Sequence, residues 1–562
     1  MKNGWTKSGA RAAALVLMCA SCGGGGTHSA SDPSGGAAPH GENVAATYFG
    51  AFEHDRVQGV SLMPDGRVLI AGETHSRFDL AGAPFSDVPA SAHHVWANGA
   101  AGSSGSDGFV AILSADLRRL EQWAYIGGCD GDRAYYAQAD RDSIYVVGIT
   151  KSLGVCSSAP FPADVIYGSS GPGDDFDVFV ARFDTSLQVR HHLAVFAGSS
   201  LGEESARGSM TLITDESGET VAVCLSGTTV SADFPVAALT TVQPSAQLDH
   251  SHSGPSDAFL IRLDAALAPQ WATFFGGAGE EYAAANVRYH AGLDALFIGG
   301  FTTSSDLPLG AAPYDDTLGG ARDGFVARFD AARGALLAAT YLGGSLDDFV
   351  GFNDDLELTP SGALAVAGST HSLDFPVSLA NAPQTTHSTL GLDADVFVSV
   401  LDPSLSSAPS FSTYLGGAGN EEASGLCCDS AGRVFVSGES QSADLEISAA
   451  SAFDGSFTTA HGANASGYAD AFLIGLDPAS ASSAACLVYG TFLGGDLSIA
   501  TPGSLHSAPP HGTRGRGLVF DALTGHLIVC GQTTTSDFPT TAGALQVGDA
   551  GEEEGFVARH LP

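Results

Sequence analysis

One unit of sequence recurs seven times along this chain of 562 residues, and that repetition limits the folds open to it. Each copy holds an acid two positions before a Phe, a Tyr or Phe followed by a Gly pair or a close variant, and an apolar segment that ends in Gly. Several copies continue into Ser-x-Asp-(Phe/Leu)-Pro. Such repetition indicates structural units that bury their apolar faces against one another. The acid-x-Phe elements begin at Asp107, Asp177, Asp257, Asp323, Asp395, Asp470 and Glu554.

Each copy predicts four short strands, because apolar residues alternate with polar ones and β-branched and aromatic residues are frequent. Gly accounts for 72 residues and falls inside almost every segment, which disfavours a solenoid of helices. We therefore expect an all-β fold, a seven-bladed β-propeller of four-stranded antiparallel blades. A two-domain β-sandwich is the alternative. In the clearest copy the strands are Phe325 to Asp330, Leu336 to Leu342, Asp355 to Leu358 and Ala363 to Gly368.

The two ends of the repeated region complement each other. The first copy begins at Tyr48 without an acid-x-Phe strand before it, whereas the last copy stops just after one, at Glu554 to Leu561. We expect the C-terminal strand to complete the first blade, which would remove the exposed edges of an open array. We also expect the acid-x-Phe strand to be the innermost of its blade, with the long connections before it crossing between blades.

The phrase from Asp323 to Asp330, followed by Tyr341-Leu-Gly-Gly344 and by Ala367 to Pro376, resembles the SBBP β-propeller repeat. The last copy, from Asp537 to Gln546, resembles the connection between repeats of that family. The similarity covers about residues 44 to 562. Members of the family are mostly bacterial exported or cell-surface proteins without common catalytic residues. The resemblance therefore implies an architecture and a location more than an activity.

The N-terminus is typical of an export signal. Residues 1 to 22 combine Lys2, Lys7 and Arg11 with a short apolar run and end in Cys-Ala-Ser-Cys. That ending resembles a bacterial lipobox, with Cys22 as the lipid-attachment residue, and ordinary signal cleavage is the alternative. Residues 23 to 43 predict a flexible Gly/Ser-rich tether, so the propeller would occupy residues 44 to 562. We expect a protein anchored by lipid at the outer membrane or cell surface.

Charge excludes one class of partner and suggests another. The chain has 23 Lys and Arg against 62 Asp and Glu, a net charge of −39, which would repel the phosphates of a nucleic acid. Acidic residues recur directly after the Gly pairs, so equivalent turns would form a ring of carboxylates on one face. Ca²⁺ suits such oxygen ligands, and a solvated rim is the alternative. The candidate metal ligands are Asp130, Asp132, Glu203, Glu204, Glu280, Glu281, Asp347, Asp348, Glu421 and Glu422.

Lipidation of Cys22 would leave seven cysteines, an odd number that cannot all pair. Cys129 and Cys156 lie in loops of one repeat and are the predicted disulfide of an oxidising compartment. No catalytic residue is predicted. We expect a non-catalytic surface scaffold that binds an unknown protein or glycan through long connections at 81 to 106, 239 to 256 and 447 to 469. The alternative is an extracytoplasmic hydrolase or lyase that uses carboxylates near a central tunnel.

Overall fold

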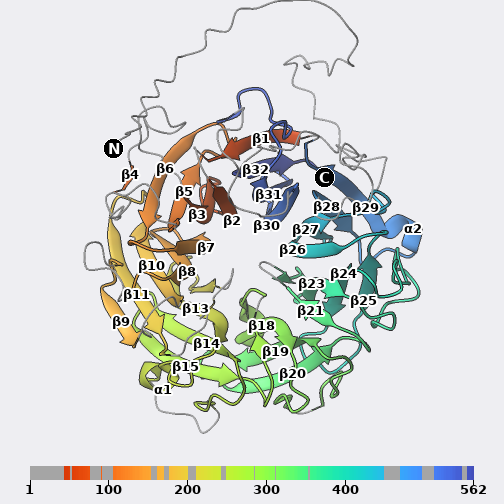
Figure 1. The fold of residues 1–562 in the computed structure, drawn as a ribbon, viewed down its shortest axis with the longest axis horizontal. Coiled ribbons are helices and arrows are strands. Elements are labelled where there is room, and N and C mark those ends of the chain that lie inside the picture. Colours follow the sequence, from red (N-terminus) through yellow and green to blue (C-terminus); the bar gives the residue numbers. More distant parts are fainter. Residues whose placement is uncertain are drawn as a thin grey trace, which may run out of the picture. The chain divides into compact units, whose positions relative to one another are not determined.

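A computed structural model describes most of the repeated region. Residues 39 to 562 form one compact unit, and its seven antiparallel sheets follow one another around a central axis (Figure 1). The expected seven-bladed β-propeller is therefore confirmed, and the two-domain sandwich is excluded. The described residues are 43–50, 54–75, 90–91, 105–153, 161–169, 176–199, 205, 210–241, 248–283, 285–310, 312–351, 355–447, 469–495, 512–546 and 553–562.

Every blade has four strand positions between the axis and the periphery. The innermost strands are β2 (Asp55–Leu62), β7 (Asp132–Ala139), β12 (Met210–Thr214), β16 (Glu281–Tyr282) with β17 (Arg288–His290), β21 (Asp348–Val350) with β22 (Leu356–Leu358), β26 (Glu421–Cys428) and β30 (Thr513–Asp521). The second strands are β3 (Val68–Thr74), β8 (Ser143–Thr150), β13 (Thr220–Thr229), β18 (Ala295–Thr302), β23 (Leu364–Thr370), β27 (Val434–Ser440) and β31 (His526–Thr533).

The third strands are the acid-x-Phe elements, and the outer strands carry the Tyr or Phe that precedes the Gly pair. The third strands are β5 (Asp107–Leu113), β10 (Asp177–Asp184), β14 (Asp257–Asp264), β19 (Asp323–Asp330), β24 (Asp395–Leu401), β28 (Asp470–Leu476) and β32 (Glu554–His560). The outer strands are β6 (Leu120–Ile126), β11 (Arg190–Ala197), β15 (Pro269–Phe275), β20 (Leu336–Leu342), β25 (Phe411–Leu415), β29 (Leu487–Leu493) and β1 (Asn43–Phe49). Two blades add a short parallel strand outside, β4 (Ala90–Ser91) and β9 (Val165–Gly168).

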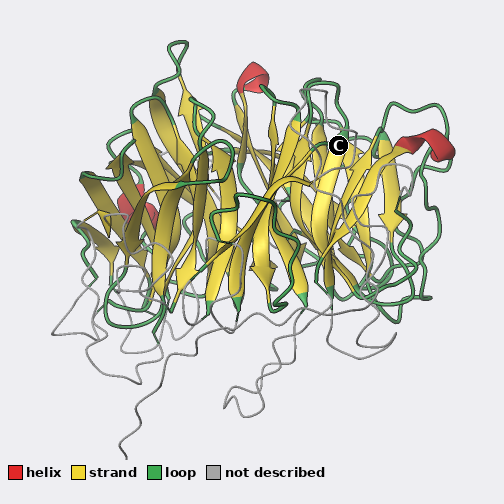
Figure 2. Ribbon diagram, turned by 90° about the horizontal axis from the view of Figure 1, so that it is seen from above, coloured by secondary structure: helices red, strands yellow, loops and turns green. Residues whose placement is uncertain are grey.

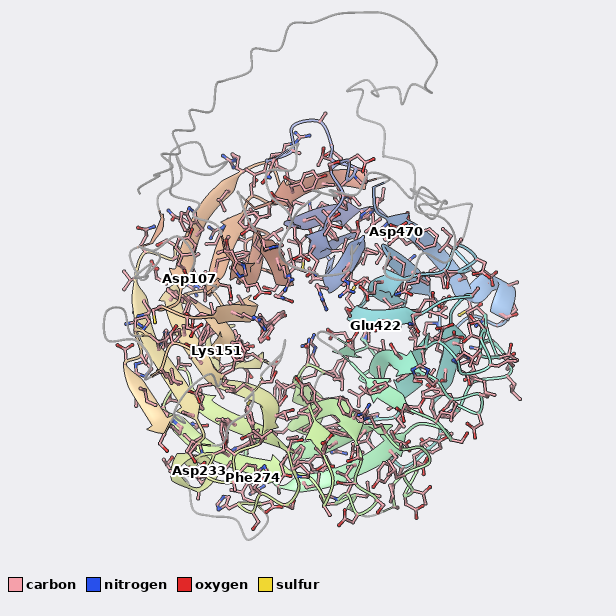
Figure 3. All side chains as sticks on the ribbon, in the orientation of Figure 1. Asp107, Lys151, Asp233, Phe274, Glu422 and Asp470 are labelled. Atoms are coloured by element: carbon pink, nitrogen blue, oxygen red, sulfur yellow. The ribbon has the colours of Figure 1, made fainter. Side chains whose placement is uncertain are left out.

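The prediction that acid-x-Phe is innermost is wrong, and so is the assignment of the long connections. The boundaries of the expected blade also differ, because its strands at 325–330 and 336–342 lie in one sheet and those at 355–358 and 363–368 lie in the next. The chain crosses between blades at the short segment that holds the Gly pair, which we call the Gly-pair turn. In Figure 3, Glu422 on β26 lies beside the centre, Asp107 and Asp470 lie further out, and Phe274 lies near the periphery. The long connections instead join the second and third strands within one blade. The two glycines of the Gly-pair turn allow the chain to pass from one blade to the next in a few residues, so the longest loop does not mark the crossing.

The predicted closure is confirmed. The C-terminal strand β32 pairs antiparallel with β1, and Phe556 lies opposite Tyr48 in the register. One sheet therefore contains β30, β31 and β32 from the end of the chain and β1 from its beginning. Because β1 is the outer strand of that sheet, unravelling either end would expose the edge of the blade.

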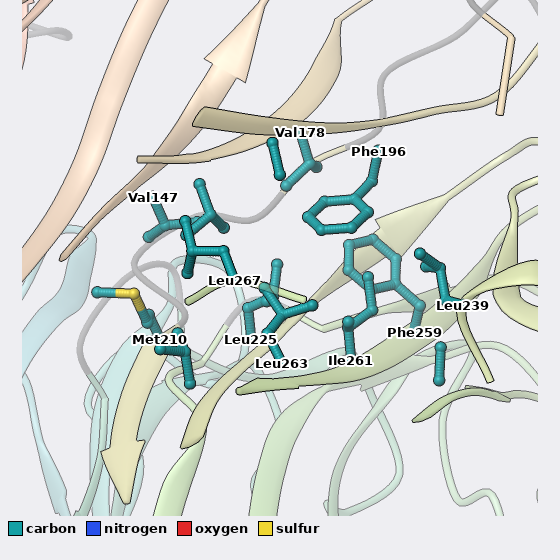
Figure 4. Close-up of a cluster of buried hydrophobic side chains, with 14 of the residues drawn as sticks. Val147, Val178, Phe196, Met210, Leu225, Leu239, Phe259, Ile261, Leu263 and Leu267 are labelled. Atoms are coloured by element: carbon teal, nitrogen blue, oxygen red, sulfur yellow. The ribbon is translucent and has the colours of Figure 1, made fainter. Parts of the chain in front are cut away.

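Seven apolar clusters lie between the seven blades, and each blade contributes to two of them. In the cluster of Figure 4, Val147 and Val178 come from one blade, and Leu225, Phe259 and Ile261 come from the next. All five side chains are fully buried. Burial of apolar area at every junction, including the one that closes the ring, holds the blades together.

The Gly of the second strand has a steric cause. A methyl group built at Gly368 would collide with the carbonyl of Phe349 on the innermost strand and lie 2.8 Å from the ring of Phe397 on the third. In four other blades the innermost strand has a β-bulge directly after the residue that pairs with the equivalent glycine. The Phe of acid-x-Phe packs over that glycine. Comparable contacts occur at Gly72, Gly148, Gly227 and Gly531. The Gly and the Phe of the repeat therefore form one packing unit across three strands.

Helix is rare in the described residues. It comprises α1 (Val236–Leu239), α2 (Ser483–Cys486) and the 3₁₀ turn η1 (Ala291–Leu293). In the part of the chain that the structure describes, none of these is long and apolar enough to cross a membrane. The strands run between two faces of the propeller (Figure 2). One face carries the Gly-pair turns together with the connections between second and third strands, and we call it the Gly-pair face.

Candidate functional site

The acids that follow the Gly pairs do not form an open rim. Asp132, Glu281, Asp348 and Glu421, each at the first position of an innermost strand, have no exposed surface. Their neighbours Asp130 and Asp347 are half-buried, and Glu280 and Glu422 are exposed. Glu203 and Glu204 lie outside the described residues. Sequence spacing placed these acids at equivalent turns, but it gave no sign that half of them point inward.

The buried acids close the Gly-pair turn by accepting backbone hydrogen bonds. The N–H of Gly344 donates to Asp348 (2.6 Å), that of Ser345 donates to Asp374 (2.8 Å), and that of Leu346 donates to the Ser372 hydroxyl (2.8 Å). Successive N–H groups of this kind make a concavity suited to an anion, and here the protein fills it with its own side chains. The same three bonds recur at Gly277 to Gly279 and at Gly417 to Gly419.

At Gly50, Gly276 and Gly343 a second carboxyl group reaches the turn from the acid-x-Phe strand. A methyl group at Gly276 would lie 2.5 Å from Oε2 of Glu281 and 2.7 Å from Oδ1 of Asp257, so the two oxygens are at most about 5 Å apart. The acid-x-Phe residue also accepts local backbone N–H bonds, as the sequence predicted: Ser253 and Gly254 donate to Asp257. The first Gly of the pair is thus required because two carboxyl groups converge on it.

Burial makes these carboxyl groups weak acids. Desolvation raises the pKa of Asp348 to about 7, against hydrogen bonds from Thr370, Gly344 and Ser372, and the charge of Asp323 adds to the shift. Desolvation likewise raises the pKa values of Asp132 and Glu421 to about 7. Within the described residues, no group of three or more His, Cys, Asp or Glu side chains has a geometry that could hold a metal ion. Calcium binding stays a prediction, which titration with thermal melting would test.

Cys129 is disulfide-bonded, and its predicted partner, Cys156, lies outside the described residues. The free cysteines of the described part are Cys224, Cys427, Cys428, Cys486 and Cys530. Burial raises the pKa of Cys224 to about 12, so this thiol stays protonated. Cys22 also lies outside the described residues, and its lipidation stays a prediction.

In six blades the second residue of the innermost strand and its partner on the second strand lie near the axis, and we call these residues, with the side chains that bind them, the inner rim. Part of this rim is charged. Arg56 binds Glu553 (2.8 Å) and Glu73 (2.9 Å), Arg133 also binds Glu73 (2.6 Å), and Arg514 binds Glu439 (2.5 Å). The pairs Glu439–Arg514, Glu553–Arg56 and Glu73–Arg133 each join two blades, at three consecutive junctions. Gln532 also donates a hydrogen bond to Glu553 (3.0 Å). We call the six side chains of these three pairs, together with Gln532, the charged sector.

The carboxyl groups of the charged sector differ in acidity. Burial favours the neutral form of Glu553, but the hydrogen bond from His54 and the charge of Arg56 lower its pKa to about 2. For Glu439 burial is the stronger effect: it outweighs the charge of Arg514 and raises the pKa. One carboxylate is therefore fixed as an anion, while another nearby in the ring of blades holds a proton more readily.

The opposite part of the inner rim is aromatic, and sequence analysis did not single it out. Tyr282 stacks on Phe301 with ring centroids 5.4 Å apart, and Phe301 meets the edge of Phe349 from the next blade at 5.2 Å. The guanidinium of Arg322 lies 5.9 Å from the centroids of both Phe rings. All three rings are half-buried, so each keeps an exposed surface. We call Tyr282, Phe301, Phe349 and Arg322 the aromatic sector.

The axis also holds a small cavity of about 180 Å³, lined by innermost strands of six blades. Its polar lining includes the Arg288–Glu357 ion pair (3.1 Å) and Cys428, and its apolar lining includes Val60 and Leu518. A volume of this size fits a few water molecules, so it is smaller than the pockets that usually enclose a metabolite. The cavity is therefore not a candidate metabolite site.

Comparisons with known proteins assign no family to this chain. The sequence matches no family model and no curated protein. Among solved structures, an α-L-arabinanase of Penicillium chrysogenum complexed with arabinobiose has 9% identity and a TM-score of 0.36, over 92% of this chain and 98% of that chain. The NanB sialidase of Streptococcus pneumoniae has 8% identity and a TM-score of 0.35, over 93% and 70%. A Dyadobacter fermentans protein of unknown function has 12% identity and a TM-score of 0.33, over 71% and 94%. Similarity at this level assigns no activity to the chain.

Proposed function

We propose that this chain is an exported, lipid-anchored, non-catalytic propeller with SBBP-type repeats that binds a protein or a glycan on its Gly-pair face. The aromatic sector carries the proposal. At the same repeat positions other blades carry Arg56 with Glu73 or Glu422 with Glu439, so the fold does not demand aromatic residues there. Half-exposed rings beside a guanidinium offer stacking and hydrogen bonding, the means by which rigid scaffolds recognise ligands.

Binding is tested on the purified full-length chain with a panel of neutral and acidic oligosaccharides, by calorimetry. Phe349→Ala removes one face of the aromatic sector and should weaken binding of any recognised oligosaccharide by at least about tenfold. Tyr167→Ala is the matched control, because Tyr167 stacks on Phe196 at the outer edge of another blade. Equal losses in the two variants would assign the effect to general packing. A wild-type chain that binds neither these oligosaccharides nor a cationic amphipathic peptide would contradict the proposed binding function.

The anchor is tested separately in bacterial cells that express the chain. Metabolic labelling with an alkyne analogue of palmitate should mark the wild-type protein and place it in the membrane fraction. Cys22→Ser should remove both the label and the membrane retention, whereas Cys19→Ser should keep them. Retention of the label in Cys22→Ser would contradict lipidation at that residue.

A hydrolase or lyase is the second candidate, and the acidity difference between Glu439 and Glu553 favours it. Acid–base chemistry on a glycosidic bond uses one protonated and one ionised carboxyl group. Glu439→Gln should then abolish hydrolysis of chromogenic glycosides or polysaccharides at a temperature where the variant is folded. Our preferred function expects no turnover by the wild-type chain, because Glu439 and Glu553 are already bound by Arg514 and Arg56.

A further inference from the structure

Four leucines with exposed side chains lie on the Gly-pair face of one blade and its Gly-pair turn. The exposed fractions are 42% for Leu346, 51% for Leu373, 78% for Leu390 and 83% for Leu392. We call these four residues the leucine patch. Single exposed leucines are ordinary, but a cluster of them on a soluble domain usually marks an interaction site.

The patch is a cluster in space and not only in number. A methyl group built at Gly391 would lie 2.9 Å from Cδ1 of Leu346 and 3.8 Å from Cδ2 of Leu373. Two leucines from separate turns therefore meet beneath the peptide that joins Leu390 to Leu392. Three segments of the chain, up to 46 residues apart, converge there.

The propeller does not require leucine at these positions. The middle residue of the Ser-x-Asp element is Leu373 in this blade, whereas it is Ala232, Ser305, Ala443 or Ser536 in other copies. The position of Leu346, defined by its N–H bond to Ser372, is occupied by Asp130, Gly279 and Gly419 elsewhere. Because the fold is built equally well with small or polar residues, the leucines serve another purpose.

Hydrogen bonds hold the loop that displays Leu390 and Leu392. The Thr389 hydroxyl donates to the carbonyl of Asp393 and accepts from its N–H, both at 3.1 Å, and the N–H of Leu392 donates to the carbonyl of Thr389 (3.3 Å). Leu390 and Gly391 have φ values of 57° and 78°, in the left-handed region. Such a conformation is unfavourable for leucine. The loop thus accepts a backbone cost while keeping two apolar side chains in solvent.

Each segment places an aspartate directly after its leucine: Asp347, Asp374 and Asp393. Asp374 is exposed, and Asp347 and Asp393 are half-buried. Among the described residues, Arg322 is the cation paired with them, and it lies 3.9 Å from Asp347. In a chain of net charge −39, this rim would repel an anionic lipid surface or another acidic copy of the chain. Its complement is an apolar segment with flanking positive charges.

We propose that the leucine patch is a docking site for a cationic amphipathic segment of another exported protein. The apolar side chains of that segment would cover the four leucines, and its Lys or Arg side chains would pair with the three aspartates. Burying the leucines provides the affinity, and the aspartates select the charge of the partner. The inference rests on the proposed binding function and specifies a protein partner for it.

The test uses the full-length chain and two fluorescent 14-residue peptides with leucines at helical spacing, one completed with Lys and one with Glu. Anisotropy is measured at about 0.15 M salt, where distant charge attraction is screened. The Leu/Lys peptide should bind at least about tenfold more weakly to Leu390→Ser/Leu392→Ser than to wild type. Leu523→Ser is the matched control, since Leu523 is 83% exposed on the turn between β30 and β31, and it should bind as wild type.

Three outcomes would overturn the inference. Equal binding of the Leu/Lys peptide to wild type and to the double variant would make the attraction purely electrostatic. Equal binding of the Leu/Glu peptide would remove the role of the aspartates. A wild-type dimer in sedimentation that the double variant dissociates would make a second copy the occupant. In each case Phe349→Ala still reports on oligosaccharide binding, so failure of the leucine patch is distinguishable from failure of the binding function.

Discussion

The charged and aromatic sectors of the inner rim occupy equivalent repeat positions, yet they do different work. In the charged sector Glu73 is 2% exposed and shared by two arginines, so its charges are satisfied within the protein. In the aromatic sector Tyr282, Phe301 and Phe349 touch one another but remain half-exposed. The strands are therefore equivalent in both sectors, but the rim side chains join neighbouring blades in the charged sector and remain partly exposed to solvent in the aromatic sector.

The largest effect is expected from breaking the charged sector. Glu73→Ala leaves two half-buried arginines without their shared carboxylate, and we expect a loss of about 3 kcal/mol in the free energy of unfolding. Ser369→Ala is the matched control at the equivalent position before the strand-ending Thr, and it should cost less than about 1 kcal/mol. Urea denaturation measures both. Similar costs for the two variants would mean that the ion pairs do not join the blades.

The next effect should be the same in both sectors, because the Gly-pair turn is common to them. Gly276→Ala forces a methyl group against Glu281 and Asp257, and Gly50→Ala forces one against Glu554 and Asp55. We expect each to cost about 2 kcal/mol through overpacking. At Gly131 the nearest atoms to an added methyl group are 4.0 Å away, so Gly131→Ala should be close to neutral. A neutral Gly276→Ala would refute the convergence of carboxyl groups on the turn.

This contrast also shows what the sequence could predict. The repeat gave the seven blades, the four strands, the closure between β1 and β32 and the backbone bonding of acid-x-Phe residues such as Asp257. It did not give the strand order. Loop length suggested that the chain crosses between blades at the long connections, whereas it crosses at the compact Gly-pair turn. It also did not show that Asp348 is buried while Asp347 is half-exposed, since adjacent acids differ only in the face of the strand that they occupy.

The aromatic and leucine-rich region was missed for a different reason. Phe349 and Leu373 stand at variable positions of the repeat, and a search for shared motifs discards such positions. An alignment of the copies would have shown Arg56, Arg133, Tyr282, Phe349, Glu422 and Arg514 in one column, each as the second residue of an innermost strand. Function in a repeat protein is thus better sought where the copies disagree.

A smaller effect concerns the buried carboxyl groups beneath both sectors. The pKa values of Asp132 and Asp348 are about 7 in the fold, well above those of an unfolded chain, so the folded state binds protons that the unfolded state releases. Their contribution to stability is complete below about pH 4 and is lost as the pH rises through about 7. As the pH rises from about 5 to 8, the free energy of unfolding of Asp348→Asn should therefore fall less than that of wild type, by on the order of 1 kcal/mol.

The measurement must be a difference between variants, because another group acts in the opposite direction. Burial lowers the pKa of His560 to about 3, so this residue makes the fold less stable as the pH falls below about 6.5. Thermal midpoints of wild type, Asp348→Asn and Asp347→Asn across the range isolate the contribution of Asp348, since Asp347 is the half-exposed neighbour. Identical profiles for all three proteins would show that Asp348 is ionised throughout.

The smallest effect on stability is expected where the proposed binding role is greatest. Leu373→Ser introduces the residue type that a neighbouring blade already carries at Ser305, and it removes a side chain that is half in solvent. We expect the free energy of unfolding to change by less than about 0.5 kcal/mol while binding of the Leu/Lys peptide falls. A cost above about 1 kcal/mol would mean that Leu373 packs the blade. The leucines would then belong with the charged sector, as residues that hold the propeller together instead of residues that meet a partner.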